Sequence, residues 1–280
     1  MLSKAQIRQK VERVLCPVDL TEDSATAVSK AVSIATAFGA ELYVCYCIEP
    51  DKEAIRDHVR GLHHIKQLLE KTNTLAPNFY WEGIIIEGEP AEAIVREASR
   101  RRVDLIVMRS RRRPYAAAIL GSTAEAISRT APCPVLISHA DEANERFVIN
   151  SILVGYDFSE YSDLALAYAY VLASIKTCTI YVLHVLATQQ DEEVPFRYSQ
   201  VLAKLKSAVP QTAGLEHVVV AGLAYREILN YAEEKKVDLI CMGSRGAGFG
   251  FRALFGSNAD RVLRQAPCPV LVCRPLKWSI

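Results

Sequence analysis

The chain has 280 residues, of which 50% are hydrophobic, and its 33 basic side chains nearly balance its 32 acidic ones. This length suits two ordinary domains, because a domain usually spans about 100–150 residues. The balanced charge argues against a general nucleic-acid binder, and no apolar run reaches the roughly 18 residues that a membrane span needs. The polar N-terminal stretch lacks the pattern of a signal peptide, so we expect a cytoplasmic protein without nucleic-acid or membrane partners.

In the first 140 residues, runs typical of strands alternate with runs typical of helices. Five strands are expected at 11–19, 41–48, 79–87, 103–108 and 135–138. Thr21 or Asp23 would cap a first helix that Gly39 ends, and further helices are expected at 90–101 and 121–130. The helix after the second strand shows one apolar stripe, formed by Ile55, Val59, Leu62 and Leu69. Such alternation predicts a parallel sheet with helices on both faces.

The chain then repeats itself. Residues 103–108 (VDLIVM) return as 237–242 (VDLICM), 134 positions later, and 131–137 (APCPVLI) return as 266–272 (APCPVLV), 135 positions later. These offsets indicate a tandem duplication. We therefore predict two α/β domains, at 1–140 and 148–280, each a doubly wound parallel sheet of five strands.

The second copy follows the same order of elements. Its strands are expected at 152–157, 179–186, 215–221, 239–242 and 270–273. Its second helix again shows an apolar stripe, formed by Val194, Tyr198, Val201, Leu205 and Ala208.

The eight cysteines include no C-x-x-C pair, so they predict neither a zinc ribbon nor a thioredoxin-like motif. Most lie in apolar runs, where cysteine behaves as a small buried hydrophobe. Redox sensing by an exposed Cys133 or Cys268 is the alternative.

A glycine-rich loop follows the fourth strand of the second copy. Two residues separate Gly243 from Gly246, nine separate Gly246 from Gly256, and Ser257 begins the next helix. Backbone N–H groups between a strand and a helix can bind phosphate, and glycine lets the backbone approach a ligand. Ser257 is placed to cap the helix or to donate to phosphate, and Arg245 or Arg252 would add positive charge. The spacing fits neither a P-loop nor a dinucleotide-binding fingerprint, and an ordinary surface loop is the alternative.

Asp157 ends the first strand of the second copy, at the carboxyl edge where such sheets bind ligands. A carboxylate there can accept a hydrogen bond from a ligand amino group. The competing interpretation is that Asp157 caps the following helix.

Together, the G-2x-G-9x-G-S spacing, Asp157 and the APCPVL endings resemble the ATP-binding branch of the universal stress protein family, over both halves. The resemblance implies the adenine nucleotide alpha hydrolase-like fold, with the two halves paired within the chain. It also implies ATP or AMP as cofactor, with Mg²⁺ as an optional companion. The implied binding residues are Asp157 and Val185 at the base, and Gly243, Gly246, Gly256, Ser257 and Asn258 around the phosphates. Met242 and Arg245 complete the predicted binding set.

The first copy departs from this pattern. Its loop has Arg109 and Arg112 in place of the first two glycines and is one residue shorter. A long side chain stands where backbone would have to approach phosphate, so we predict no ATP in the first half. The arginines of this loop, Arg109, Arg111, Arg112 and Arg113, are expected to form either an anion site or a partner-facing patch.

The sequence thus predicts a stress-response protein with one ATP or AMP site, in its second half. No histidine or serine stands in a known catalytic pattern, so we assign no catalytic residue and no metal ligand. Two alternatives are a nucleotide-independent scaffold, acting on a protein partner through the arginine loop, and a slow ATPase. A single chain and a homodimer are both compatible with the sequence.

Overall fold

The computed structural model describes residues 11–21, 24–48, 54–73, 80–110, 120–138, 147–174, 176–187, 194–246 and 255–277. They form two compact units. The first unit comprises the described residues up to 148 together with 275–277, and the second comprises those from 149 to 274. In the first unit, Lys277 N donates a hydrogen bond to Pro132 O at 3.1 Å.

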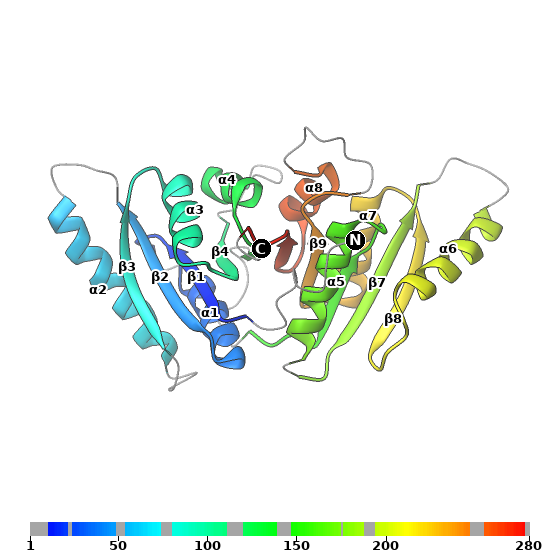
Figure 1. The fold of residues 1–280 in the computed structure, drawn as a ribbon, viewed down its shortest axis with the longest axis horizontal. Coiled ribbons are helices and arrows are strands. Elements are labelled where there is room, and N and C mark those ends of the chain that lie inside the picture. The colour runs from blue at the N-terminus through cyan, green and yellow to red at the C-terminus, as the bar shows by residue number, and fades with distance from the viewer. Residues whose placement is uncertain are drawn as a thin grey trace. The chain divides into compact units, whose positions relative to one another are not determined.

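The first unit alternates strands and helices from end to end. Its elements are β1 Arg13–Val18, α1 Ser24–Phe38, β2 Glu41–Ile48, α2 Ala54–Asn73, β3 Trp81–Glu87, α3 Pro90–Arg100, β4 Leu105–Arg109, α4 Ser122–Thr130 and β5 Val135–Ser138. The strands lie in the order β3-β2-β1-β4-β5, and the pairs are parallel. Helix α1 packs beside α2, and α3 packs beside α4 (Figure 1).

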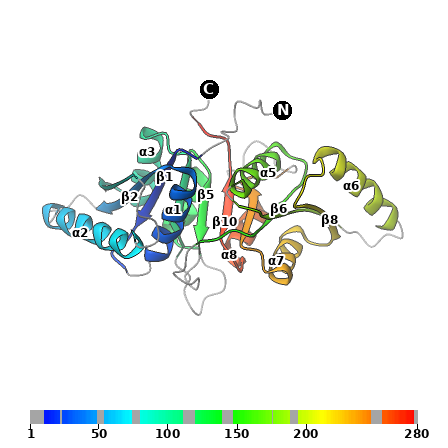
Figure 2. The ribbon, with the colours of Figure 1, turned by 90° about the horizontal axis from the view of Figure 1, so that it is seen from below.

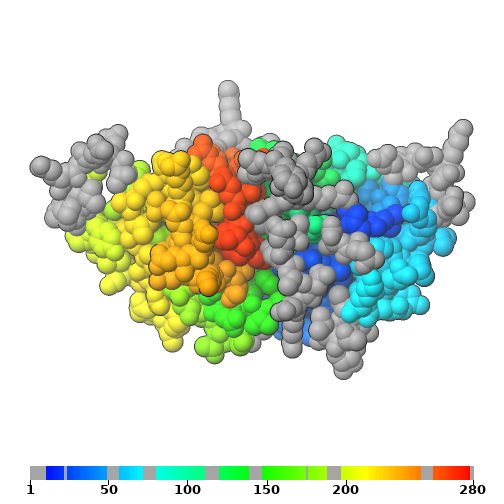
Figure 3. All heavy atoms as spheres, turned by 180° about the vertical axis from the view of Figure 1, so that it is seen from behind, coloured from blue at the N-terminus to red at the C-terminus, as the bar shows by residue number. Residues whose placement is uncertain are grey.

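The second unit has the same order of elements. They are β6 Ser151–Gly155, α5 Glu160–Ala173, β7 Thr179–Leu186, α6 Val194–Ala208, β8 Leu215–Ala221, α7 Ala224–Lys235, β9 Leu239–Gly243, α8 Ser257–Gln265 and β10 Val270–Cys273. The strand order is β10-β9-β6-β7-β8, again with parallel pairs. Helices α5 and α6 lie on one side of these strands, and α7 and α8 lie on the other (Figure 2). Helices α7 and α8 also form a continuous surface in the space-filling view (Figure 3). The predicted parallel α/β class is confirmed.

Equivalent aspartates, Asp104 and Asp238, accept hydrogen bonds from the backbone at the start of the first strand of each unit. Asp104 Oδ2 accepts hydrogen bonds from Glu12 N and Arg13 N, both at 2.9 Å. Asp238 Oδ2 accepts from Asn150 N at 2.8 Å and from Ser151 N at 2.9 Å. The V-D-L-I repeat therefore ties the amino end of the first strand to the segment that leads into the fourth.

The predicted apolar stripe of α2 is wrong in part. Val59 and Leu62 are 65% and 40% exposed, whereas Ile65 and Leu68 are buried together with Leu69. The reason is Gly61, where an added Cβ would lie 2.4 Å from Cδ1 of Tyr46. The helix comes close to the sheet at this glycine, and the buried face runs through positions 61, 65 and 68. Ile55 has no described side chain.

The stripe predicted for α6 is also wrong in part. Leu205 is fully buried and Val201 is half-buried, but Tyr198 and Ala208 are exposed. Val209, one residue past the end of the helix, is buried instead. The side chain of Val194 lies outside the described ones.

Candidate functional site

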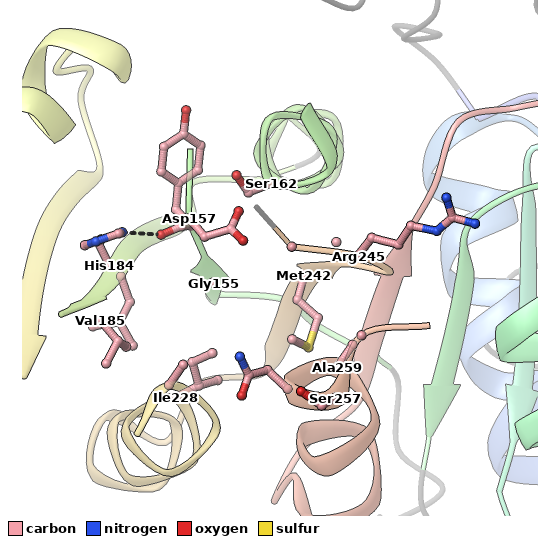
Figure 4. Close-up of a pocket in the computed structure, with 17 residues that line it drawn as sticks. Gly155, Asp157, Ser162, His184, Val185, Ile228, Met242, Arg245, Ser257 and Ala259 are labelled. Carbon is pink, nitrogen blue, oxygen red and sulfur yellow. Dashed lines mark hydrogen bonds between the residues drawn. The ribbon is translucent and has the colours of Figure 1, made fainter. Parts of the chain in front are cut away.

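The second unit has a cavity of about 350 Å³ at the carboxyl ends of its strands. The ends of β6, β7 and β9 contribute to its wall, as do the first turns of α7 and α8 (Figure 4). All nine residues that the sequence singled out line this one cavity: Asp157, Val185, Met242, Gly243, Arg245, Gly246, Gly256, Ser257 and Asn258.

Helix α8 presents its N-terminus to the cavity without a side-chain cap. Its N-cap is Gly256, with φ −76° and ψ 142°, so Ser257 is the first helical residue and does not cap the helix as expected. By contrast, the N-cap Ser159 of α5 accepts a hydrogen bond from Ser162 N. The first-turn N–H groups of a helix have no intrahelical acceptor, and they attract anions together with the helix dipole. The start of α8 is therefore suited to an anionic group.

Asp157 organises the turn between β6 and α5. Its Oδ1 accepts hydrogen bonds from Ser159 N at 3.1 Å and from Ser159 Oγ at 2.5 Å. Since Ser159 is the N-cap of α5, the competing interpretation of Asp157 as the cap is wrong. The next residue, Phe158, has φ +63°, a conformation uncommon for an aromatic residue and often found near functional sites.

A side chain at Gly243 or Gly246 would collide with other residues of the protein. A Cβ at position 243 would lie 2.6 Å from Cβ of Tyr161 and 2.9 Å from its backbone carbon, on α5. A Cβ at position 246 would lie 2.6 Å from Oδ2 of Asp157. The sequence had suggested ligand approach as the cause. Close packing on the backbone of α5 already requires a glycine at 243, whereas a Cβ at 246 would push the Asp157 carboxylate aside.

The two ends of the glycine-rich loop are held together. Ser244 N donates to Cys273 O, and Gly256 N donates to Ser244 O, each at 2.9 Å. Ser244 is 3% exposed, so this anchor is buried. Arg252 lies outside the described residues.

Arg245 lines the cavity, but its guanidinium is directed away from it (Figure 4). The guanidinium carbon lies over the ring of Tyr161, 5.7 Å from the centroid. Such stacking is a cation–π contact. The proposed role of Arg245 toward phosphate stays a prediction.

The wall opposite α8 contains an aromatic cluster that the sequence did not reveal. His184 Nδ1 lies 2.8 Å from Tyr156 O, the contact dashed in Figure 4. The His184 ring packs on Phe158, with centroids 4.8 Å apart. Tyr156 OH donates to Asp163 Oδ1 at 2.5 Å, and burial followed by this hydrogen bond raises the pKa of Tyr156. His184 thus lies half-buried at the cavity wall.

The apolar wall was also missed, although the repeat contained a signal for it. Ile228 on α7 lines the second unit's cavity, and Ile94 on α3 lines a cavity of about 340 Å³ in the first unit. The two isoleucines are 134 positions apart, the same offset as the V-D-L-I strands. Comparing the repeats beyond their strands would have identified both.

Two findings concern metals and membranes. Within the described ranges, no three His, Cys, Asp or Glu side chains form a group that could hold a metal ion. None of the helices described is both long and apolar enough to cross a membrane.

Comparisons with known proteins all point to the same protein family. The model of the universal stress protein family matches residues 10–139 and again 149–274. The universal stress protein Rv2005c of Mycobacterium tuberculosis is 31% identical over 182 residues, which is 59% of this chain and 59% of that relative. A universal stress protein of Thermus aquaticus is 29% identical over 137 residues, 45% of this chain and 100% of the relative. The matched region therefore spans less than two thirds of the mycobacterial relative.

Solved structures show the same fold. The crystal structure of a universal stress protein from Archaeoglobus fulgidus covers 94% of this chain and 98% of its own, with a TM-score of 0.67 and 26% identity. A protein from Pseudomonas aeruginosa, PA1789, aligns over 98% of this chain and 95% of its own, with a TM-score of 0.71 and 20% identity.

Proposed function

We propose that this chain, which belongs to the universal stress protein family, is a cytoplasmic stress-response protein that binds one adenine nucleotide, ATP or AMP, in its second unit. One observation carries the proposal. The nine residues chosen from the sequence, which come from β7, β9, α8 and the segments beside them, line a single cavity of about 350 Å³.

The cavity offers different chemistry at its two ends. Asp157 supplies a carboxylate that can accept a hydrogen bond from the adenine amino group, and Ile228 and Met242 add apolar side chains to the wall of the same cavity. The uncapped start of α8 supplies N–H groups and the Ser257 hydroxyl, which suit phosphate oxygens. An apolar slot with a few directional polar groups is typical of a small-molecule site.

We propose that the protein binds the nucleotide, and experiment must decide whether it also hydrolyses ATP. In this proposal Mg²⁺ would be held mainly by phosphate oxygens, as is usual for this ion in nucleotide sites. His184, the histidine in the wall, has Nδ1 against a backbone carbonyl, an arrangement that orients the ring. A slow ATPase would be revealed by phosphate release that depends on Asp157.

A pair of substitutions at Ser257 tests the phosphate end. The side chain is exposed at the first position of α8, where a carboxylate favours the helix dipole but repels phosphate. Ser257→Glu should therefore preserve folding and weaken ATP binding by at least about tenfold, since 1.4 kcal/mol is a factor of ten. Ser257→Ala, which removes only the hydroxyl, should lose less. Calorimetric titration with ATP, alongside the thermal midpoint, measures both effects.

Asp157→Asn tests the base end. An amide oxygen can still accept from Ser159, so the turn is kept while the negative charge is lost. We expect ATP to bind at least about tenfold more weakly, because hydrogen bonds to charged groups are worth about 1.5–3 kcal/mol. We also expect any preference of the parent chain for ATP over GTP to be lost, because GTP has no amino group at the corresponding position of its base. Absence of adenine nucleotide binding at millimolar concentration would instead support the scaffold alternative.

A further inference from the structure

The first unit has its own cavity, of about 340 Å³, at the edge of the sheet that corresponds to the second unit's site. We propose that it is a second ligand site, which takes a purine nucleoside or its monophosphate and rejects the triphosphate. The choice of a purine rests on the proposed function of the second unit, because the base end is assigned by correspondence between the repeats.

The base end of the first cavity keeps the arrangement of the second. Asp19 Oδ1 accepts hydrogen bonds from Thr21 N at 3.0 Å and Ser24 Oγ at 2.8 Å, just as Asp157 Oδ1 is held by Ser159. The apolar walls correspond as well, with Ile94 and Met108 at the positions that Ile228 and Met242 occupy in the second unit. The same carboxylate and the same slot are thus available to a planar base.

The start of α4 also keeps the anion-binding geometry. Its N-cap is Gly121, with φ −61° and ψ 145°, and no side chain caps the helix. Gly256 at the start of α8 has nearly the same values, φ −76° and ψ 142°. Ser122 follows Gly121 as Ser257 follows Gly256. Gly121 and Ser122 line the first cavity. One phosphate group could therefore be held here by first-turn N–H groups.

The end of β4 is where the two cavities differ. Arg109 lines the first cavity at the position of Gly243, whose backbone faces the second cavity without any side chain. An arginine there presents a side chain where the second unit presents only backbone, although the two cavities are similar in volume, about 340 and 350 Å³. Its guanidinium stays charged at all physiological pH values and can match a single phosphate. We therefore assign at most one phosphate to the first cavity, on the basis of this exchange of Gly243 for Arg109.

Cys47 gives this cavity a reporter that the other lacks. It lines the first cavity where Val185 lines the second, and it is half-buried, with Sγ donating to Gly88 O at 3.2 Å. A ligand in the cavity should cover the thiol. Cys178, a half-buried thiol in the second unit that lines neither cavity, serves as a control for effects of the ligand outside the cavity.

The test is the rate of Cys47 alkylation by iodoacetamide in the full chain, measured peptide by peptide with mass spectrometry. At ten times its Kd, adenosine or AMP should slow Cys47 about tenfold through site occupancy, while ATP at the same concentration should not. The rate at Cys178 should not change. An unchanged Cys47 rate with both adenosine and AMP, or equal protection by ATP, overturns the proposal. Ser257→Glu changes only the site in the second unit. Its effect on ATP binding therefore tests the proposed function separately from the proposed site in the first unit.

Arg109→Ala tests the phosphate selectivity. We expect AMP to protect Cys47 about tenfold less effectively, because a charge-assisted hydrogen bond is lost, while adenosine protects as before. Asp19→Asn, which keeps an acceptor for Thr21, should weaken both ligands. If AMP loses nothing relative to adenosine in Arg109→Ala, the assigned role of Arg109 is wrong.

Discussion

The carboxylate of Asp157 lies against the backbone of Gly246, so closely that a Cβ at position 246 would come within 2.6 Å of Oδ2. The contact joins the two parts of the candidate site, because Asp157 follows β6 and Gly246 belongs to the glycine-rich loop after β9. A change in the loop can therefore alter the base end without touching a ligand.

Gly246→Ala should displace the Asp157 carboxylate and weaken ATP binding about tenfold, with a loss of unfolding free energy near 1 kcal/mol, as is typical for a single substitution. Calorimetric titration and urea denaturation measure the two effects. Gly39→Ala is the control: its φ is +61° with nothing within 4 Å, so it should cost stability through backbone strain alone. Equal ATP affinity in Gly246→Ala and the parent chain would contradict the inferred coupling.

Gly61→Ala should destabilise the first unit, because its Cβ would lie 2.4 Å from Cδ1 of Tyr46 and 2.8 Å from Cδ1 of Ile85. Overpacking of this kind usually costs about 1–3 kcal/mol, more than the helix gains from exchanging glycine for alanine. Thermal unfolding measures the shift. Arg60→Ala, at the neighbouring position with a side chain 62% exposed, should change the midpoint little. A more stable Gly61→Ala chain would show that the helix can move away from β2 and β3.

Glu97→Gln should remove part of the acid sensitivity of the first unit. The hydrogen bond from Arg100, and then that from Arg101, lower the pKa of Glu97 below its usual 4.5 despite its burial. A carboxyl group whose pKa is lower in the folded state stabilises the fold above its unfolded pKa, and this contribution is lost as the pH falls through the folded value. The stability advantage of the parent chain over Glu97→Gln should therefore be full at neutral pH and shrink below about pH 4.5.

Urea denaturation at neutral pH and near pH 3.5 measures that advantage, which should decline as the carboxylate becomes protonated. Glu70→Gln is a suitable control, because the side chain of Glu70 is 63% exposed and pairs only loosely with Lys66, at 3.7 Å. Parallel pH profiles for the parent chain and Glu97→Gln would contradict the predicted role.

Four cysteines should resist alkylation in the folded protein. Cys16, Cys45, Cys241 and Cys273 are buried, and burial raises the pKa of each thiol. Since the thiolate is the reactive form, their peptides should stay unmodified by iodoacetamide at pH 8 and become modified in urea. Burial also raises the pKa of Cys178 to about 11, so it should react slowly. Cys133 and Cys268 are buried too, which argues against the alternative that either is an exposed redox sensor.

Much of the fold could be predicted because it follows from short apolar runs and from repetition. The strands at Thr179–Leu186, Leu215–Ala221 and Val270–Cys273 have the bounds expected from the sequence. Helix faces were harder, because periodicity shows that a helix has an apolar side but not how closely each turn meets the sheet. Gly61 decided that question for α2, through a contact with Tyr46 that the sequence does not reveal.

The candidate site could be predicted where it depends on local spacing. Gly243, Gly246 and Gly256 were chosen from one loop, and all three line the cavity. The reason for the first two was not accessible, because it depends on where Tyr161 and Asp157 lie across the loop. Contacts between distant elements, such as Phe158 on His184, were missed for the same reason. Arg111, Arg112 and Arg113, expected to bear a patch, lie outside the described residues.

The hydrogen bond from Gly256 N to Ser244 O means that the loop leaves and returns to the sheet at one fixed place. The first unit has a comparable closure, with Gly121 N donating to Ser110 Oγ at 3.4 Å. Between such fixed ends the loop can differ in length and sequence while the end of the strand and the start of the following helix stay joined. The two copies thus share a closure at the ends of the loop while the loops differ in length and sequence, which makes the loop the natural unit for exchange between the two halves.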